Sequence, residues 1–165
     1  MEIRDNLGNL LAACEEDRLG ACDVDGFNLQ NANLRGADLT GMLISFTDFS
    51  FADLRGATFY WDTLIDVRLE GANLEGTDLA GTDLIRVNFR DANLRNADIG
   101  PSGLGPPSSV FGCDFTGADL EGTVFTRAQY DEDTRFPEGF DKAKWGMTFR
   151  SKTEWQAKPT TPPSP

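Results

Sequence analysis

The side chains that most often carry out chemistry in proteins are scarce in this chain. Its 165 residues include no histidine and only three cysteines, Cys14, Cys22 and Cys113. Cys22 and Cys113 fall at positions that the repeat described below directs inward, about four coils apart, which excludes a disulfide between them by reach. A Cys14 to Cys22 bridge stays geometrically open. Without histidine, and with cysteine in the core, nucleophilic triads and zinc sites are disfavoured.

Carboxylates are the remaining candidates, and they recur along the outward positions of the chain. Examples are Asp38, Asp78, Asp98 and Asp119. Exposed carboxylates at such spacing usually bind solvent or nearby backbone N–H groups. Asparagine and threonine interrupt them, and no cluster offers the six oxygens that calcium or magnesium prefers. The sequence therefore predicts no catalytic residue, no metal and no cofactor, which is the pattern of a non-enzyme.

The element that positions these side chains is a five-residue repeat. Counting in fives from Val24 to Ile99, all sixteen positions are apolar. The residue two before each centre is small or apolar, with Asp62 as the departure. A period of five fits neither a helix nor a strand, so each pentad must be one short extended side followed by a bend. Centre and i−2 side chains then point inward, and the other three point outward.

The pentad Ala32-Asn33-Leu34-Arg35-Gly36 shows the A(D/N)LXX pattern, which resembles the pentapeptide-repeat family over roughly two thirds of the chain. The closing segment is similar to those of short bacterial members, many of them cyanobacterial. The resemblance implies a right-handed quadrilateral parallel β-helix with four pentads to a coil. A slower rhythm supports four sides independently, because Ala-Asn/Asp-Leu recurs every twenty residues from Ala32.

The chain divides into four expected regions. Residues 1–21 carry apolar residues at helical spacing and predict an N-terminal capping helix. Residues 22–130 form about five coils, bounded at every twenty residues, with the second coil at 42–61. Residues 131–150 form a C-terminal cap, and 151–165 a disordered proline-rich tail.

A loop rich in glycine, proline and serine interrupts the repeat at 101–109. Leu94 and Leu120 occupy matching sides but lie 26 residues apart, which is one coil plus six residues. The loop is therefore an insertion within one coil, and the sides before and after it stay aligned. We expect it to protrude and to offer a contact surface. Its members are Pro101, Ser102, Gly103, Leu104, Gly105, Pro106 and Pro107.

Departures from the repeat point to a candidate interaction surface. Large apolar residues occupy outward positions of the second coil. Two isoleucines, twenty residues apart, stack on the first side of the third and fourth coils. These residues are Phe46, Phe51, Tyr60, Trp61, Ile65 and Ile85. Either a terminus or the loop covers this patch, or it binds a partner or a second copy of the chain. Asp62 also departs, and either its side is irregular or its carboxylate finds a backbone donor.

The net charge of −12 opposes direct binding to nucleic acid and attracts basic protein surfaces, although it also serves solvation. The sequence favours a non-enzymatic acidic scaffold for an unidentified protein partner, with homodimerisation open. The resemblance implies an alternative, a DNA mimic that binds a topoisomerase such as DNA gyrase, against which the short rod and modest charge count. No signal peptide or membrane-spanning stretch stands out, so the expected location is the cytoplasm.

Overall fold

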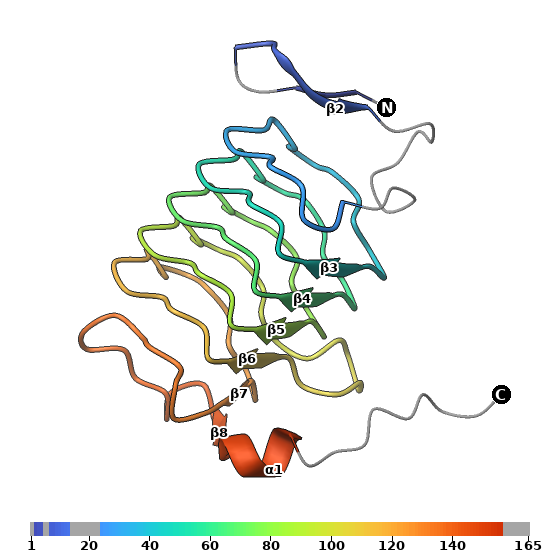
Figure 1. Cartoon of the computed structure of the whole chain (residues 1–165). Helices are drawn as coiled ribbons and strands as arrows, with labels where there is room; N and C mark the ends of the chain where they lie inside the picture. Colours follow the sequence, from blue (N-terminus) through green and yellow to red (C-terminus); the bar gives the residue numbers. More distant parts are fainter. Residues whose placement is uncertain (1, 5–6, 14–23, 157–165) are drawn as a thin grey trace, which may run out of the picture.

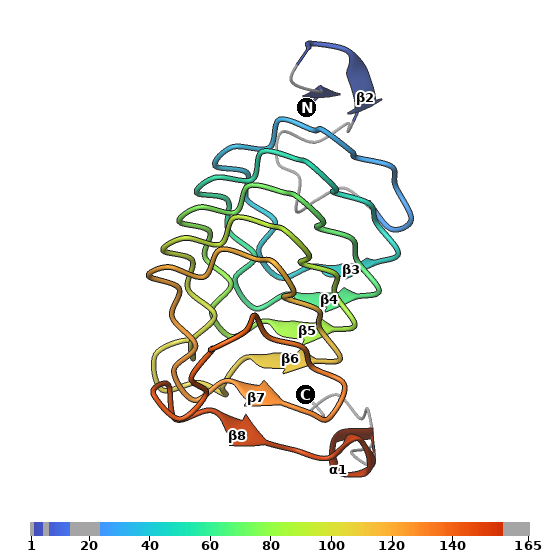
Figure 2. The same ribbon diagram turned by 90° about the vertical axis from the view of Figure 1, so that its left-hand side faces the viewer.

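The molecule is a stack of square coils, seen from two directions in Figures 1 and 2. The structure is a computed structural model that describes residues 2–4, 7–13 and 24–156. Parallel bridges join residues twenty apart, such as Asn33 to Asp53 and Asp53 to Asn73. Each coil therefore hydrogen-bonds to the next through equivalent positions, giving a parallel β-helix of about five turns. The fold class expected from the pentads is confirmed.

One side of the solenoid is regular enough to form a six-stranded parallel sheet in chain order (Figure 2). The strands are β3 (Leu43–Ser45), β4 (Thr63–Ile65), β5 (Asp83–Ile85), β6 (Ser109–Phe111), β7 (Gln129–Tyr130) and β8 (Thr148–Phe149). Leu64 pairs with Leu84, and Leu84 pairs with Val110. The step of 26 residues confirms that the loop is inserted in a single coil and leaves the sides aligned.

The interior is filled by the pentad centres and the i−2 side chains. Centres from Leu29 to Ile99 are buried, and aromatic centres stack along the axis, with the rings of Phe89 and Phe115 4.9 Å apart and nearly parallel. Inward hydroxyls are satisfied by backbone. Thr47 Oγ1 donates to Val24 O at 2.7 Å, and Thr82 Oγ1 donates to Phe59 O at 2.7 Å. The core is thus apolar with a few fully bonded hydroxyls.

Corners separate the sides, and every corner from Gly26 to Asn96 has a left-handed backbone. Residues two after the centre have positive φ, for example 63° at Gly36 and 64° at Gly56. Glycine suits this conformation because it has no Cβ to clash with the neighbouring carbonyl. Larger residues occupy the same conformation in the second coil, with φ of 57° at Phe46, 60° at Phe51 and 62° at Trp61.

The expected N-terminal capping helix is wrong for the residues that the structure describes. They form an antiparallel hairpin of β1 (Glu2–Arg4) and β2 (Leu10–Ala13). Gly8, with φ of 88°, lies in the connection between them, where a helix would be interrupted. The hairpin also supplies a hydrogen-bond acceptor for the backbone of the first coil, because Arg4 O accepts a hydrogen bond from Asn33 N at 2.7 Å. Backbone carbonyls inside a helix are already hydrogen-bonded within the helix. The expectations for residues 14–21, Cys14 and Cys22 lie outside the described residues.

The C-terminal end of the solenoid is covered by large apolar residues, most of them aromatic. Phe136, Phe140, Trp145 and Met147 pack against the core. The disordered tail expected from residue 151 is wrong for its first residues, because Lys152–Gln156 form helix α1. Trp155 anchors this helix: its ring stacks on Phe111 at 4.9 Å and 4°. Residues 157–165 lie outside the described part of the chain.

No helix within the described ranges is long and apolar enough to span a membrane.

Candidate protein-interaction site

The outward surface of the six-stranded sheet, termed here the sheet face, carries a row of apolar side chains. Ile65 pairs with Ile85, and Ile85 pairs with Phe111, so these three residues follow one another down the axis. Ile65 and Ile85 are half-buried, and Phe111 is buried beneath Trp155. The two isoleucines stack as the twenty-residue spacing predicts. The row continues into a region that the sequence reasoning missed.

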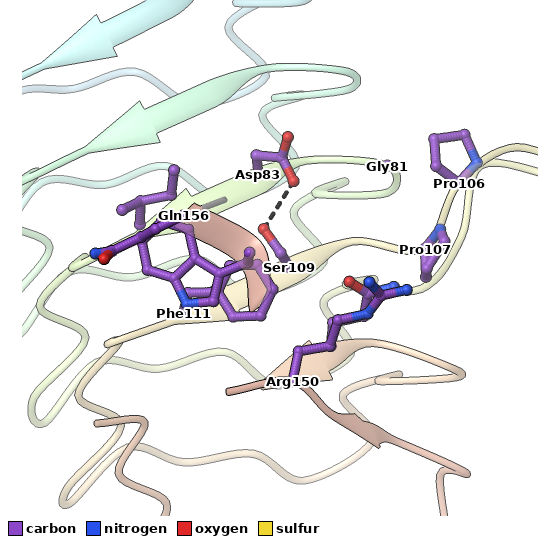
Figure 3. A pocket seen from close by; sticks show the side chains of 11 residues that line it. Gly81, Asp83, Pro106, Pro107, Ser109, Phe111, Arg150 and Gln156 are labelled. Atoms are coloured by element: carbon purple, nitrogen blue, oxygen red, sulfur yellow. Dashed lines mark hydrogen bonds between the residues drawn. The ribbon is translucent and has the colours of Figure 1, made fainter. Parts of the chain in front are cut away.

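That region is a groove of about 680 Å³ between the inserted loop and the C-terminal segment. Figure 3 shows Pro106 and Pro107 on one side with Arg150 below them, Asp83 and Ser109 in the middle, and Phe111 and Gln156 on the other side. The main lining residues are Ile85, Pro106, Pro107, Phe111, Arg150 and Trp155. Three segments far apart in the chain therefore build one open, mostly apolar site.

Polar groups sit at defined places in the groove. Ser109 Oγ donates to Asp83 Oδ1 at 2.7 Å, which fixes both side chains on the floor (Figure 3). Trp155 Nε1 donates to Asp131 Oδ2 at 3.1 Å, which holds the indole in place. By contrast, the Arg150 guanidinium makes no hydrogen bond or ion pair with any residue that the structure describes. It is therefore available to a ligand.

The aromatic residues of the second coil do not form one patch. Trp61 lies at the corner before β4 and Phe46 at the corner after β3, so these two flank the sheet face. Phe51 lies one side further on, and its ring covers Gly71 of the next coil, where an added Cβ would approach within 2.5 Å. All three are more than half exposed. Phe51 thus belongs to a different surface from Phe46 and Trp61.

The inserted loop folds back toward the second coil. Tyr60 and Ser102 are joined by a hydrogen bond between their hydroxyls, and the Trp61 indole lies close to Gly105. The indole also lies 3.1 Å from where a Cβ on Gly81 would be. The loop therefore covers part of Trp61, while Leu104 at its tip is fully exposed. The use of the loop or of Trp61 as a contact surface stays a prediction.

A smaller hollow of about 430 Å³ lies beside Phe46. Its charged residues are paired: Arg86 bonds Asp66 at 2.7 Å. This hydrogen bond holds the pKa of the Asp66 carboxyl below its usual range. A charge already compensated on the surface offers little to a ligand. The groove, with its free guanidinium, is the better binding site.

Asp62 is buried, and one carboxylate oxygen finds a backbone donor, as one of the two expectations had it. Oδ1 accepts from Met42 N at 2.7 Å, whereas Oδ2 is buried without a partner among the described residues. Burial raises the pKa of Asp62 to about 7. Because Asp62 has no opening to solvent, it fits a structural irregularity better than an active site.

Reactive groups do not converge elsewhere in the described ranges. Cys113 is buried as expected, and burial raises the pKa of its thiol, which suppresses the thiolate. The outward aspartates bond to nearby backbone, as Asp78 Oδ1 does with Ala80 N at 2.9 Å. Over the described residues, no group of three or more candidate metal ligands occurs.

Two signals in the sequence could have revealed the groove. Phe111 follows Ile85 by 26 residues, so the register that placed the loop also places Phe111 in the apolar row. Trp155 lies in the segment that is expected to be a disordered tail because of its prolines, although those prolines all come later, from Pro159 onward. No spacing rule pointed to Arg150, because its position depends on how the C-terminal cap packs.

Comparison with known proteins supports the fold. The family model of pentapeptide repeats matches eight copies over residues 20–59, 64–99 and 111–129, more than half of the chain. A search of curated proteins finds no match. Among solved structures, a pentapeptide repeat protein from the cyanobacterium Cyanothece is 25% identical with a TM-score of 0.56, over 62% of this chain and 65% of that one. The chain thus spans slightly less than two thirds of that relative.

Two further solved structures are similar to this chain over a larger share of its length. A pentapeptide repeat protein from Nostoc is 31% identical over 76% of this chain and 84% of that one, with a TM-score of 0.43. The plasmid-mediated fluoroquinolone resistance protein QnrB1 is 15% identical over 81% and 83%, with a TM-score of 0.42. With the family model matching the pentads that build the solenoid, this chain belongs to the pentapeptide repeat family.

Proposed function

We propose that this protein is a non-enzymatic acidic scaffold that binds a protein partner through its sheet face. One observation carries the proposal: the apolar row from Ile65 to Phe111 opens into a groove of about 680 Å³. Contiguous apolar surface of this kind usually marks a contact site. Proteins of this family are generally structural or interaction scaffolds, which fits a site without convergent reactive groups.

The corners beside the sheet face add support. Phe46 and Trp61 are exposed and hold left-handed backbone conformations that disfavour bulky side chains. Such strain amounts to about 1–3 kcal/mol per residue and concentrates at functional sites. Neither ring fills the core, although the Trp61 indole packs against Gly105 of the inserted loop. Contact with a partner accounts for the exposed part of both rings, because aromatic side chains are enriched at the centres of interfaces.

The test is capture of partners from native extract with wild-type protein and with a Phe46→Ser/Trp61→Ser double variant. We expect the double variant to lose a partner that the wild type retains, with little change in melting temperature. Phe51→Ser is the matched control, since Phe51 is equally exposed but lies on another surface, and it should retain the partner. A large loss of thermal stability in the double variant would instead identify an internal packing seam.

The partner could also be a second copy of this chain, which would then form a homodimer through the same sheet face. Sedimentation equilibrium of wild type and of the double variant separates the two cases. A wild-type dimer that becomes monomeric in the double variant makes the partner a second copy of the chain. A monomer in both leaves a different protein as the partner.

A second candidate, a DNA mimic that binds a topoisomerase such as DNA gyrase, has one observation in its favour. The side that precedes the sheet face carries Asp38, Asp78 and Asp98, with no lysine or arginine between residues 36 and 41, 56 and 61, 76 and 81, or 96 and 101. An acidic side of this kind, interrupted at Thr58, could present phosphate-like charge. Gyrase supercoiling that is unaffected by excess protein would rule this candidate out.

A further inference from the structure

We propose that the groove beside the inserted loop binds a proline-rich segment of a partner protein, in polyproline II conformation and carrying a basic residue. This inference rests on the proposed function, because it names the kind of partner that the sheet face would receive. The groove is open, and its lining comes from the loop, the sheet and the C-terminal segment (Figure 3).

The apolar surfaces of the groove suit proline rings. Trp155 and Phe111 stack in parallel at 4.9 Å, and Pro106 and Pro107 form the facing wall. The volume of about 680 Å³ lies in the range of pockets that bind ligands, roughly 300–1,000 Å³. Grooves lined by aromatic residues are the usual receptors for polyproline II segments, whose rigid shape lowers the entropic cost of binding.

The uncommitted polar groups match the hydrogen-bonding character of such a segment. Proline lacks an N–H group, so a proline-rich chain in polyproline II presents carbonyl acceptors without internal hydrogen bonds. The groove offers donors: the Arg150 guanidinium and the side-chain amides of Gln129 and Gln156, which form no hydrogen bond with the described residues. These donors are positioned along the apolar wall. A ligand rich in acceptors therefore fits better than one rich in donors.

The backbone of the floor argues against an added β-strand. A peptide joins a sheet only at an open edge, where N–H and C=O groups are unpaired. β5 pairs with both β4 and β6, and β6 pairs with both β5 and β7. The strands under the groove therefore have no free edge. A ligand must bind through side chains, as polyproline II segments do.

The negative charge of the groove floor predicts a basic residue next to the prolines of the ligand. Asp83 is exposed on the floor, and only its Oδ1 is engaged, by Ser109. Its other oxygen has no hydrogen bond or ion pair with a described residue. The chain as a whole carries −12. A lysine or arginine next to the prolines would lie toward Asp83, with long-range attraction from the acidic solenoid.

The experiment is fluorescence anisotropy of the full-length chain with a short labelled peptide that contains several prolines and one lysine. We expect saturable binding that weakens about tenfold when the prolines are replaced by alanine, because the rigid conformation and the ring contacts are lost. Arg150→Gln should weaken binding about tenfold as well. Asp83→Asn should weaken binding less and reduce its dependence on salt.

Arg135→Gln is the matched control, since Arg135 is exposed and its charge pairs with Asp114 away from the groove. It should leave peptide affinity unchanged, and circular dichroism melts should show that both arginine variants remain folded. Absence of saturable binding overturns the inference, as does equal affinity for the alanine peptide or for folded Arg150→Gln. Binding seen only after removal of residues 157–165 would make this chain's own prolines the occupant and overturn the assignment to a partner.

Failure here is distinguishable from failure of the scaffold proposal. A partner captured by wild type and lost by the Phe46→Ser/Trp61→Ser variant, with no peptide bound, leaves the scaffold standing and removes only the proline-rich ligand. Peptide binding without any such partner would place function in the groove alone.

Discussion

The second and third coils share one interior and differ at their surface. Leu54 and Leu74 are both fully buried at matching centres, one coil apart. At the corners, Phe46, Phe51 and Trp61 of the second coil are followed by Asp66, Gly71 and Gly81. The core thus tolerates little variation, while corners accept bulky residues at a cost in backbone strain. Packing of the core therefore does not explain the bulky residues at the corners of the second coil.

The largest expected effect tests whether the core is packed equally well in the second and third coils. Leu54→Ala and Leu74→Ala should each lower the free energy of unfolding by about 2–5 kcal/mol, because each removes a buried side chain and leaves a cavity. We expect the two losses to agree within about 1 kcal/mol, since the coils share packing. Urea unfolding followed by circular dichroism measures both. A much smaller loss for Leu54→Ala would show that the second coil is less tightly packed than the third.

Asp62 gives the next effect, because it breaks the pattern of inward hydroxyls. Thr82, one coil further on, donates to a backbone carbonyl, so Asp62→Thr should find the equivalent carbonyl and remove an unpaired buried oxygen. Because the substitution also removes the acceptor of Met42 N, the expected net gain is only about 1–2 kcal/mol in unfolding free energy at pH 8. Asp62→Asn is the control for charge alone. A decrease in stability for the threonine variant would contradict this account.

The same residue predicts how stability depends on pH. Burial raises the pKa of Asp62 to about 7, above the value of about 3.9 for an unfolded aspartate. Between these values the folded state holds the extra proton, so the contribution of Asp62 to stability is fully present below about pH 4 and is lost as pH rises through 7. Melting temperatures of wild type and Asp62→Thr should therefore diverge between about pH 4 and pH 7 and run parallel above that. Profiles that are parallel over the whole pH range would refute the assignment.

Corner strain is a smaller effect, and Phe46 isolates it. Phe46→Gly should be more stable than Phe46→Ala by about 1 kcal/mol, because both lose the ring and only alanine keeps the Cβ in the left-handed conformation. Thermal melts of the two variants give the difference. Equal stability would mean that the corner relaxes, which would weaken the case that Phe46 is kept for binding.

The smallest effect concerns the corner that follows Phe46 along the axis. Arg86→Gln removes the ion pair with Asp66, whose two side chains are 50% and 32% exposed. Surface pairs contribute about 0.2–1 kcal/mol, less at high salt. Chemical denaturation at low and high sodium chloride should show the difference shrinking with salt. A salt-independent loss would point to packing by the arginine stem.

The periodic part of the molecule could be predicted, and its aperiodic ends could not. Each pentad forms its backbone bridges with its equivalents in adjacent coils, so register follows from counting, even across the inserted loop. The N-terminal hairpin depends instead on backbone groups left open by the first coil, such as Asn33 N. The spacing of apolar residues gives no information about those backbone groups, so it predicts a helix as the N-terminal cap.

The candidate site divides in the same way. Ile65 and Ile85 could be placed beforehand because they repeat at twenty residues. Assigning Phe51 and Phe46 to different surfaces required knowing which residues form corners. Predicting the groove required the position of Trp155, which is set by stacking on Phe111 and by its hydrogen bond to Asp131. Contacts between a terminal helix and a sheet have no period, so no pattern in the sequence announces them.

The twenty-residue register also has an evolutionary consequence. Because every coil presents the same bridging positions above and below, duplicating one coil in the gene would lengthen the rod by one strand spacing, about 4.8 Å, without disturbing either cap. Deleting one would shorten it equally. Rod length is therefore a heritable variable that changes in whole steps, and the distance between the hairpin and the groove could change by gene duplication while the groove itself stays intact.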